Sequence, residues 1–292
     1  MKDVHQFSFS EWLYLTPVKA YWKEKRNDWV LSRYLQKKVP EQLEFLSKNH
    51  HLKAQKLLLV IAFEQVKVLD WLMQLGKKNI QNYQLMVFDN SKSQAKRHQI
   101  KQLCDAFQIP YLGLPPNRTT HPNRSHGMAM TWVYNHVVKT IEPKVFGFLD
   151  HDMIPVKPIS EEGWMSEQSC YGVLNTGFSC WNLWAGYSFF QYQKVKDLPL
   201  NFLYDFSRGV DTGGRNWLPL YSQMSEQHIS FAQDEFIPVR LSQDVDATVQ
   251  LIDHTWIHIG GVSYNNNFQP KEVFYEKLVH ELLAGRSLNE FK

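Results

Sequence analysis

The sequence has little cysteine and no long apolar run. Its 3 cysteines include no pair at the C-x-x-C spacing, so we expect a reducing compartment rather than a disulfide framework. No stretch approaches the roughly 18 consecutive apolar residues of a transmembrane helix, and the first ten residues contain no apolar signal core. We therefore expect a cytoplasmic protein without a membrane-spanning segment.

A strong charge of one sign is also missing. The formal net charge is only +3 over 292 residues, which gives no reason to expect a nucleic-acid partner. Aromatic residues, in contrast, are abundant, with 10 Trp, 13 Tyr and 18 Phe. They can bury a large core and can also supply flat faces for stacking on sugars or bases.

Residues 1–55 form a predicted N-terminal helical extension. They contain 10 Lys and Arg against 6 Asp and Glu, and aromatic residues are interleaved with these charges. The pattern indicates either a peripheral surface for a membrane or partner, or aromatic side chains packed on the main domain. We favour packing, and contact with the inner face of a membrane is the alternative.

Regular alternation of strand and helix patterns begins after the extension. Apolar runs and helical spacing predict these elements in turn: strands at 56–63, 84–88, 109–114 and 145–149, and helices at 66–75, 93–107 and 125–141. Ser93 is a predicted helix N-cap and Gly76 a predicted helix end. The repeats predict an α/β fold with a mostly parallel central sheet flanked by helices. Ligands of such sheets bind beyond the carboxyl ends of the strands.

This regularity stops near residue 158. We expect a first half at 56–158 and a second half at 159–292 that packs on the same sheet. In the second half the patterns predict, in order, an irregular aromatic segment at 170–190, a helix at 217–226, a strand and turn at 251–264, and an amphipathic helix at 271–284.

Asp150-His151-Asp152 directly follows the fourth predicted strand. Carboxylate oxygens are ligands that Mg²⁺ and Mn²⁺ prefer, and a turn at the strand end lets both reach one ion. Asp89 ends the second strand, so parallel strands bring it to the same edge of the sheet. The sequence therefore predicts one site, in which a metal holds phosphates. The alternative is a turn with two solvated carboxylates.

These residues resemble the GT-A fold nucleotide-sugar glycosyltransferases, especially family 2-like members. Phe148 to Asp152 resembles their DxD motif, and Val87 to Ser91 the end of their second strand, over roughly residues 56–155. The resemblance implies a Rossmann-like GT-A sheet, a UDP- or GDP-linked sugar donor, Mn²⁺ or Mg²⁺ as cofactor, and an irregular C-terminal region that binds the acceptor. Glycan, lipid and protein acceptors all stay open.

The resemblance also implies roles for individual residues. Asp89 would contact the nucleotide base, and Arg124 and His126 would line the donor pocket. Asp150 and Asp152 would hold the metal, with Asp150 also near the substrate. Two further roles come from the C-terminal half: His258 is the expected third metal ligand, with His254 as the alternative, and Trp181 is expected near the sugar.

The Gly-rich segment 210–217 offers a catalytic base. Gly213 lets the backbone approach a ligand closely, and Asp211 could deprotonate an acceptor hydroxyl. Asp234 is a rival candidate for the same role. Either carboxylate could instead simply stabilise a turn.

We therefore expect a metal-dependent glycosyltransferase. One alternative is a HAD-type phosphatase, in which the first Asp of the motif is a nucleophile; there the motif normally opens the fold, whereas three strand–helix units precede it here. The other alternative is a non-catalytic nucleotide-sugar-binding protein, which would bind a donor without turnover.

Overall fold

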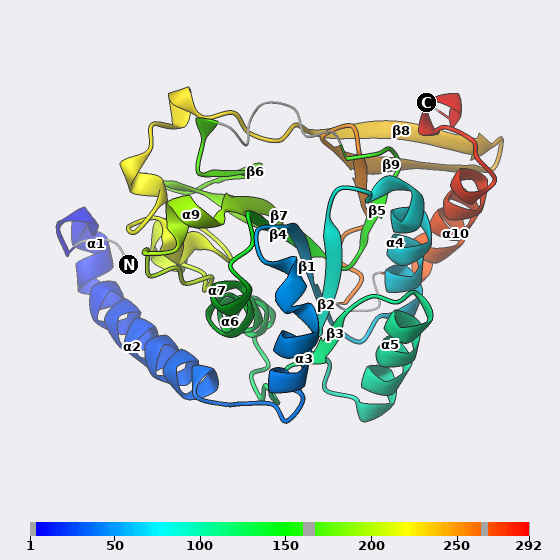
Figure 1. Cartoon of the computed structure of the whole chain (residues 1–292). Helices are drawn as coiled ribbons and strands as arrows, with labels where there is room; N and C mark the ends of the chain where they lie inside the picture. Colours follow the sequence, from blue (N-terminus) through cyan, green and yellow to red (C-terminus); the bar gives the residue numbers. More distant parts are fainter. Residues whose placement is uncertain (1–3, 160–166, 264–267, 292) are drawn as a thin grey trace.

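The computed structural model describes residues 4–159, 167–263 and 268–291 (Figure 1). A six-stranded central sheet has the order β3-β2-β1-β4-β7-β6. Its strands are β1 Lys56–Ala62, β2 Gln84–Asp89, β3 Tyr111–Gly113, β4 Val145–Asp150, β6 Cys170–Thr176 and β7 Trp181–Gln191. The first four strands in this order are parallel, and β7 and β6 complete the sheet in antiparallel pairing. The predicted α/β class and mostly parallel sheet are confirmed.

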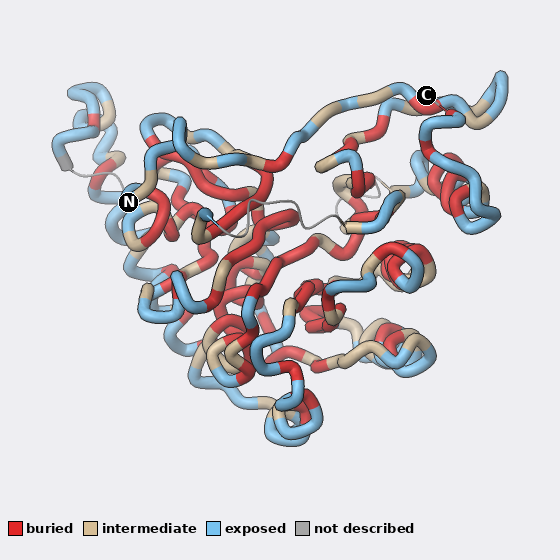
Figure 2. The backbone as a smooth tube through the Cα atoms, turned by 45° about the horizontal axis from the view of Figure 1, so that its top comes forward, coloured by how far each residue is buried: buried red, intermediate tan, exposed pale blue. Residues whose placement is uncertain are grey.

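Helices cover both faces of the central sheet, which explains the unbroken apolar run of β1. Leu57 and Leu59 pack on the face that carries α3 and α6, while Leu58 and Val60 pack on the face that carries α4 and α5. Figure 2 shows the buried strands at the centre and the exposed outer helix faces. These helices are α3 Gln42–Asn49, α4 Val66–Asn79, α5 Gln94–Ala106 and α6 Pro122–Val133. A π-helical turn, Tyr134–Val138, and α7 Lys139–Ile141 extend α6.

The N-terminal extension is helical in its described part, as predicted; the first three residues lie outside the described residues. It contains η1 Val4–Gln6, α1 Phe9–Leu13, α2 Thr16–Leu35, α3 and η2 His50–Leu52. In Figure 1, α1 and α2 run along one side of the molecule. Tyr34 of α2 is buried, and its hydroxyl donates to the Pro115 carbonyl oxygen at 3.3 Å, so the end of α2 is anchored on the main body.

A second, antiparallel sheet has the order β5-β10-β9-β8. Its strands are β5 Met153–Pro155, β8 Asp234–Ser242, β9 Val245–Ile252 and β10 Trp256–His258. Together with α10, Gln269–Leu283, it packs against the outer side of α4 through Trp71 and Leu75. The amphipathic helix predicted at 271–284 is confirmed, but the long β8–β9 hairpin was not predicted.

Three local predictions are wrong. Residues 170–190 are not irregular: they form β6 and β7, whose burial on both faces removes the alternation that would reveal a strand. Gly76 lies inside α4 rather than at its end. The helix expected at 217–226 is absent, and Pro219 lies there between two short 3-10 turns.

The remaining short elements are α9 Tyr192–Val195, η4 Phe206–Arg208, η5 Gly214–Asn216, η6 Tyr221–Gln223, η7 Glu226–His228 and η8 Leu288–Phe291.

Candidate metal and donor site

The Asp150-His151-Asp152 segment joins the two sheets. Asp150 is the last residue of β4, and β5 begins at Met153. Strand β10 pairs antiparallel with β5 and places His258 opposite Met153, while the Ile259 N–H donates to the Asp152 carbonyl oxygen at 3.1 Å. Strand pairing therefore brings His258 beside Asp152, although the two are far apart in the sequence.

The three side chains at this junction form a cluster that fits a divalent cation. One ligand atom from each of Asp150, Asp152 and His258 lies within 4.8 Å of the others, and His258 Nε2 is 3.6 Å from an Asp152 carboxylate oxygen. Ligands about 2.1 Å from one ion lie roughly 3 to 4.3 Å from each other. The alternative ligand, His254, is exposed and pairs with Glu235 at 2.9 Å.

A hydrogen-bonded chain sets the orientation of the His258 ring. Gln250 Nε2 lies 2.8 and 3.0 Å from the two carboxylate oxygens of Asp234, and because a carboxylate only accepts, the amide nitrogen must face it. The Gln250 oxygen then faces His258 Nδ1 at 2.6 Å and can only accept. The proton of a neutral His258 is thus held on Nδ1, which leaves the Nε2 lone pair directed toward Asp152.

The position of Asp150 depends on a glycine in the adjacent strand β7. A Cβ at Gly186 would lie 2.6 Å from an Asp150 carboxylate oxygen and 2.2 and 2.4 Å from ring atoms of Trp184. The Trp184 ring in turn packs on the His258 ring, with the centroids 4.7 Å apart. The missing side chain at Gly186 therefore leaves the space in which Asp150 and Trp184 lie.

His126 approaches Asp150 from α6. Its Nε2 lies 3.8 Å from an Asp150 carboxylate oxygen. Burial nevertheless lowers the pKa of His126 below its usual value of 6.5, against the opposing effect of the Asp150 charge. The ring is therefore mostly neutral near pH 7, and it can donate or accept a hydrogen bond at the pocket wall.

A cavity of about 730 Å³ opens in front of the cluster. Polar groups from several segments line it, including Asn90 and Lys92 after β2, Asn123 and His126 of α6, and Ser263. The Asn90 amide donates to Ser125 Oγ at 3.0 Å, which holds the loop after β2 against α6. The volume suits a substrate larger than a single sugar ring.

Several residues predicted from the resemblance lie elsewhere. Asp89 is 0% exposed, and its carboxylate accepts from the Ser91 N–H at 2.8 Å and from the Tyr111 hydroxyl at 2.9 Å. Asn90 lines the cavity in its place. Trp181 is buried against Trp217 and Tyr221 rather than near the cavity. The predicted substrate contacts of Asp89 and Trp181 stay predictions.

The predicted residues of the acceptor side lie beside the N-terminus of α6. Asp211 accepts from the amide of Asn123, which lines the cavity, at 2.5 Å, and from the Thr212 N–H at 2.7 Å. Arg124 was predicted to line the donor pocket, but the described cavity lining does not include it, and its guanidinium donates to the Tyr204 hydroxyl at 3.3 Å. Its substrate contact stays a prediction. Gly213 has a φ of +89°, which glycine adopts without strain, and its N–H donates to the Phe202 carbonyl oxygen. Asp211 thus contacts Asn123 of the cavity lining without lining the cavity itself, whereas Asp234 is bound to Gln250.

Three residues of the site were not predicted: Asn90, Gly186 and Gln250. Asn90 follows Asp89 at a strand end, so its position could have been inferred. Gln250 could not, because it reaches the site only through the β8–β9 hairpin, which has no ligand motif. Gly186 matters because its missing side chain leaves space for Asp150 and Trp184. A single sequence does not reveal that these side chains lie beside it.

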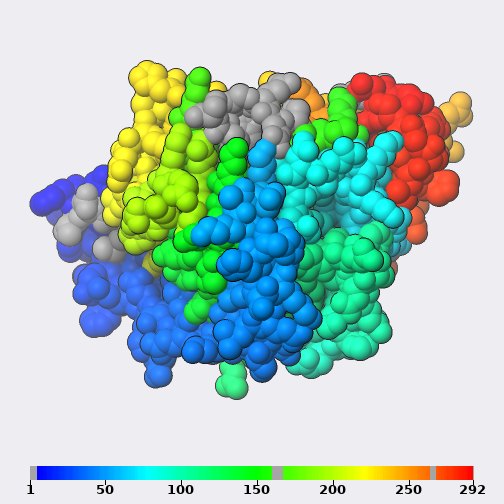
Figure 3. All heavy atoms as spheres, in the orientation of Figure 1, coloured from blue at the N-terminus to red at the C-terminus, as the bar shows by residue number. Residues whose placement is uncertain are grey.

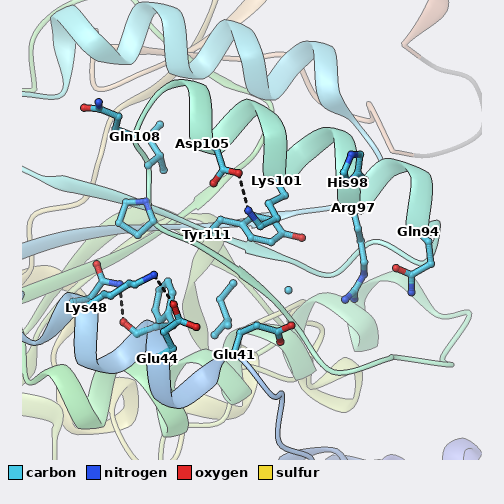
Figure 4. Close-up of a pocket in the computed structure, with 16 residues that line it drawn as sticks. Glu41, Glu44, Lys48, Gln94, Arg97, His98, Lys101, Asp105, Gln108 and Tyr111 are labelled. Carbon is cyan, nitrogen blue, oxygen red and sulfur yellow. Dashed lines mark hydrogen bonds and ion pairs between the residues drawn. The ribbon is translucent and has the colours of Figure 1, made fainter.

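A second cavity, of about 800 Å³, lies between α3 and α5 beside β3 (Figure 4). Two ion pairs lie in its lining, Lys48 with Glu44 and Lys101 with Asp105. Arg97 is engaged with the carbonyl oxygens of Ser91 and Leu114. In this second cavity the named charged side chains are therefore bound within the protein. In the cavity at the DxD segment, by contrast, polar side chains line the open space.

Comparison with known proteins gives only distant matches. No family model and no curated protein matches the sequence. Among solved structures, the chain is similar to a mannosyltransferase, PcManGT from Pyrobaculum calidifontis in complex with GDP-Man and Mn²⁺, at 8% identity and a TM-score of 0.36, covering 65% of this chain and 57% of that one. TarS of S. aureus matches at 14% identity and a TM-score of 0.36, covering 51% and 30%.

LgtC, as an active-site mutant, matches at 11% identity and a TM-score of 0.34, covering 47% of this chain and 58% of that one. These matches are to GT-A-type glycosyltransferases, the group that the sequence resembles. The chain spans less than two thirds of each matched structure. Because the sequence identities and TM-scores are this low, the function proposed below rests on the geometry of the site.

Proposed function

We propose that the chain is a metal-dependent glycosyltransferase that moves a sugar from a UDP- or GDP-linked donor to an acceptor hydroxyl. The observation that carries the proposal is the Asp150, Asp152 and His258 cluster, which lies at the carboxyl edge of the sheet and opens into a cavity. A Mn²⁺ or Mg²⁺ ion held there would neutralise charge on a departing nucleoside diphosphate.

The chain's own residues supply the remaining functions. Asn90 and His126 offer neutral hydrogen-bonding groups to the donor at the cavity wall. Asp211, oriented by Asn123 and the Thr212 N–H, is the proposed base. It would take the proton of the acceptor hydroxyl as the new glycosidic bond forms and the bond from the sugar to the diphosphate breaks.

A panel of nucleotide sugars tests this function by thermal shift, with and without Mn²⁺, followed by measurement of released nucleoside diphosphate. We expect one UDP- or GDP-sugar to stabilise the protein only with metal, and to be turned over. Absence of a metal-dependent shift for every donor would contradict the proposal. Binding without turnover would identify a binding protein, and phosphate release from a phosphomonoester would identify a phosphatase.

Replacement of His258 by alanine should weaken Mn²⁺ binding by at least about 10-fold, because even the outer partners of metal ligands are worth about 10- to 100-fold. Titration of Mn²⁺ by calorimetry measures this directly. The matched control is His254→Ala, which removes an exposed imidazole paired with Glu235 on the same sheet and should leave the affinity unchanged. Equal affinity of both variants would remove His258 from the site.

Gln250→Leu tests whether the hydrogen bond to Nδ1 positions His258. The substitution keeps the approximate size of the side chain but removes the acceptor at 2.6 Å, so the ring can rotate or change tautomer. We expect Mn²⁺ affinity to fall by about 10-fold. Gln250→Glu combined with Asp234→Asn restores an acceptor for Nδ1–H and avoids two adjacent carboxylates, so this double variant should bind more tightly than Gln250→Leu. Unchanged affinity in Gln250→Leu would contradict the positioning role.

A further inference from the structure

Exposed apolar side chains gather on α1, on α2 and on the turn between them. Of the large apolar residues that are exposed in the described part of the chain, nine lie between residues 9 and 29, including Phe9, Leu13, Tyr14, Trp22 and Trp29. Trp22 is 67% exposed and Trp29 is 60% exposed. The expectation that the N-terminal aromatics pack on the main domain is therefore wrong for most of them, although it holds for Tyr34.

Helix α2 has two opposite apolar faces. Leu31 and Tyr34 are buried on the body of the protein. Val18, Trp22 and Trp29 follow each other at intervals of four and seven residues, and so form a stripe on the other side of the helix. A helix that only packed on its own domain would not need the second stripe. Figure 3 shows α1 and α2 at one edge of the molecule.

The charged residues of α2 also differ between its inner side and its exposed side. Its two acidic residues, Glu24 and Asp28, both pair with Arg215 on the main body. Its basic residues include Arg26 and Arg33, which follow Trp22 and Trp29 by four residues and so lie along the exposed stripe. The Arg33 guanidinium lies 5.1 Å from the Trp29 ring centroid. The outward face therefore combines indole rings with Arg26 and Arg33, which form no ion pair with an acidic side chain among the described residues.

We propose that the outer face of α1 and α2 docks in the plane of an anionic lipid bilayer. Tryptophan and tyrosine rings are suited to the boundary between headgroups and acyl chains, and flanking Lys and Arg are attracted to anionic headgroups. No helix in the described residues is long and apolar enough to cross a membrane, so this contact is interfacial. A second copy of the chain fits less well, because it would bring two cationic faces together.

This docking does not depend on the proposed transferase activity, but it would bring the site to its acceptor. Asn27 on the inner side of α2 donates to the Tyr204 hydroxyl at 3.2 Å, and Arg124 donates to the same oxygen. Helix α2 thus contacts Tyr204, which holds Arg124 next to Asn123, the cavity-lining residue that pairs with Asp211. If the proposed function holds, the docked face favours an acceptor attached to a lipid.

Co-sedimentation of the full chain with vesicles tests the docking, without nucleotide or metal. We expect binding to phosphatidylcholine vesicles that contain phosphatidylglycerol, at least about 10-fold weaker binding to pure phosphatidylcholine, and loss of binding with added salt. Trp22→Ser combined with Trp29→Ser should lower binding by at least about 10-fold. The control is Phe236→Ser, which removes an equally exposed ring from β8.

Two results would overturn the docking: no binding to anionic vesicles, or equal binding by the double variant. If the wild-type chain instead forms dimers that the double variant does not, the face is an interface between copies. Because no donor is present, failure of vesicle binding is distinct from failure of donor turnover, and turnover of a water-soluble acceptor would leave the docking result unchanged.

Discussion

Asp152→Asn should abolish stabilisation of the protein by Mn²⁺ and lower transferase activity by about 1,000-fold, which corresponds to about 4 kcal/mol of lost charge stabilisation. Asp152 is 5% exposed, and its carboxylate faces the His258 Nε2. Asparagine keeps the shape but removes the charge that a cation requires. Melting temperature at increasing Mn²⁺ and donor hydrolysis are the measurements.

The same substitution should behave differently without metal. Asp150 and Asp152 are neighbouring carboxylates, so removing one charge relieves repulsion, and the metal-free variant should melt at the same temperature or higher. Asp246→Asn, in the exposed β8–β9 turn region, is the control and should respond to Mn²⁺ as the wild type does. A metal-free Asp152→Asn variant that is strongly destabilised would indicate that Asp152 acts in folding instead.

Gly186→Ala should reduce metal-dependent turnover by about 100-fold, because a displacement of about 1 Å at a reacting group has an effect of that size. The new methyl group would overlap the Trp184 ring and the Asp150 carboxylate. Both are ends of side chains, so they would move while the strand keeps its place. The loss of folding free energy should therefore stay within about 1 to 3 kcal/mol.

Gly113→Ala is the matched control, since it adds the same methyl group at another strand of the same sheet. Its Cβ would lie 3.2 Å from Arg97 Nη1 and 3.5 Å from the Tyr111 hydroxyl. A shift of a few tenths of an ångström relieves such contacts, so metal affinity and turnover should be unchanged. Calorimetric Mn²⁺ titration of both variants separates a local effect from a general one. If Gly186→Ala binds Mn²⁺ normally, the space beside β7 is not what positions Asp150.

The parallel part of the fold could be predicted because its signals are local. Strand β1 is a continuous apolar run, Ser93 accepts from the Lys96 N–H as the expected N-cap, and Asp150 ends a buried strand. These features depend on neighbours within a few residues. The position of the DxD segment at the carboxyl edge then followed from the general geometry of parallel sheets.

The rest of the site depends on pairings between distant residues. His258 reaches Asp152 only because β10 pairs with β5. Without that register, the sequence does not show which of its histidines lies beside the two aspartates. Trp181 and Trp184 both belong to β7, yet an odd interval turns them to opposite faces, the first into the core and the second toward His258. Sequence alone did not predict that strand, so it could not distinguish them.

The junction between the two sheets has a mechanical consequence. Asp150 and Asp152 lie where the central sheet passes into the second one, and His258 comes from a strand of the second sheet. An ion shared by these three side chains would act as a cross-link that closes a loop of about 100 residues, and such cross-links restrict the unfolded chain. Binding of the ion would then slow the local opening of the β8–β9 hairpin. The rate of backbone amide exchange in the hairpin would therefore report whether an ion is bound at the end of β4.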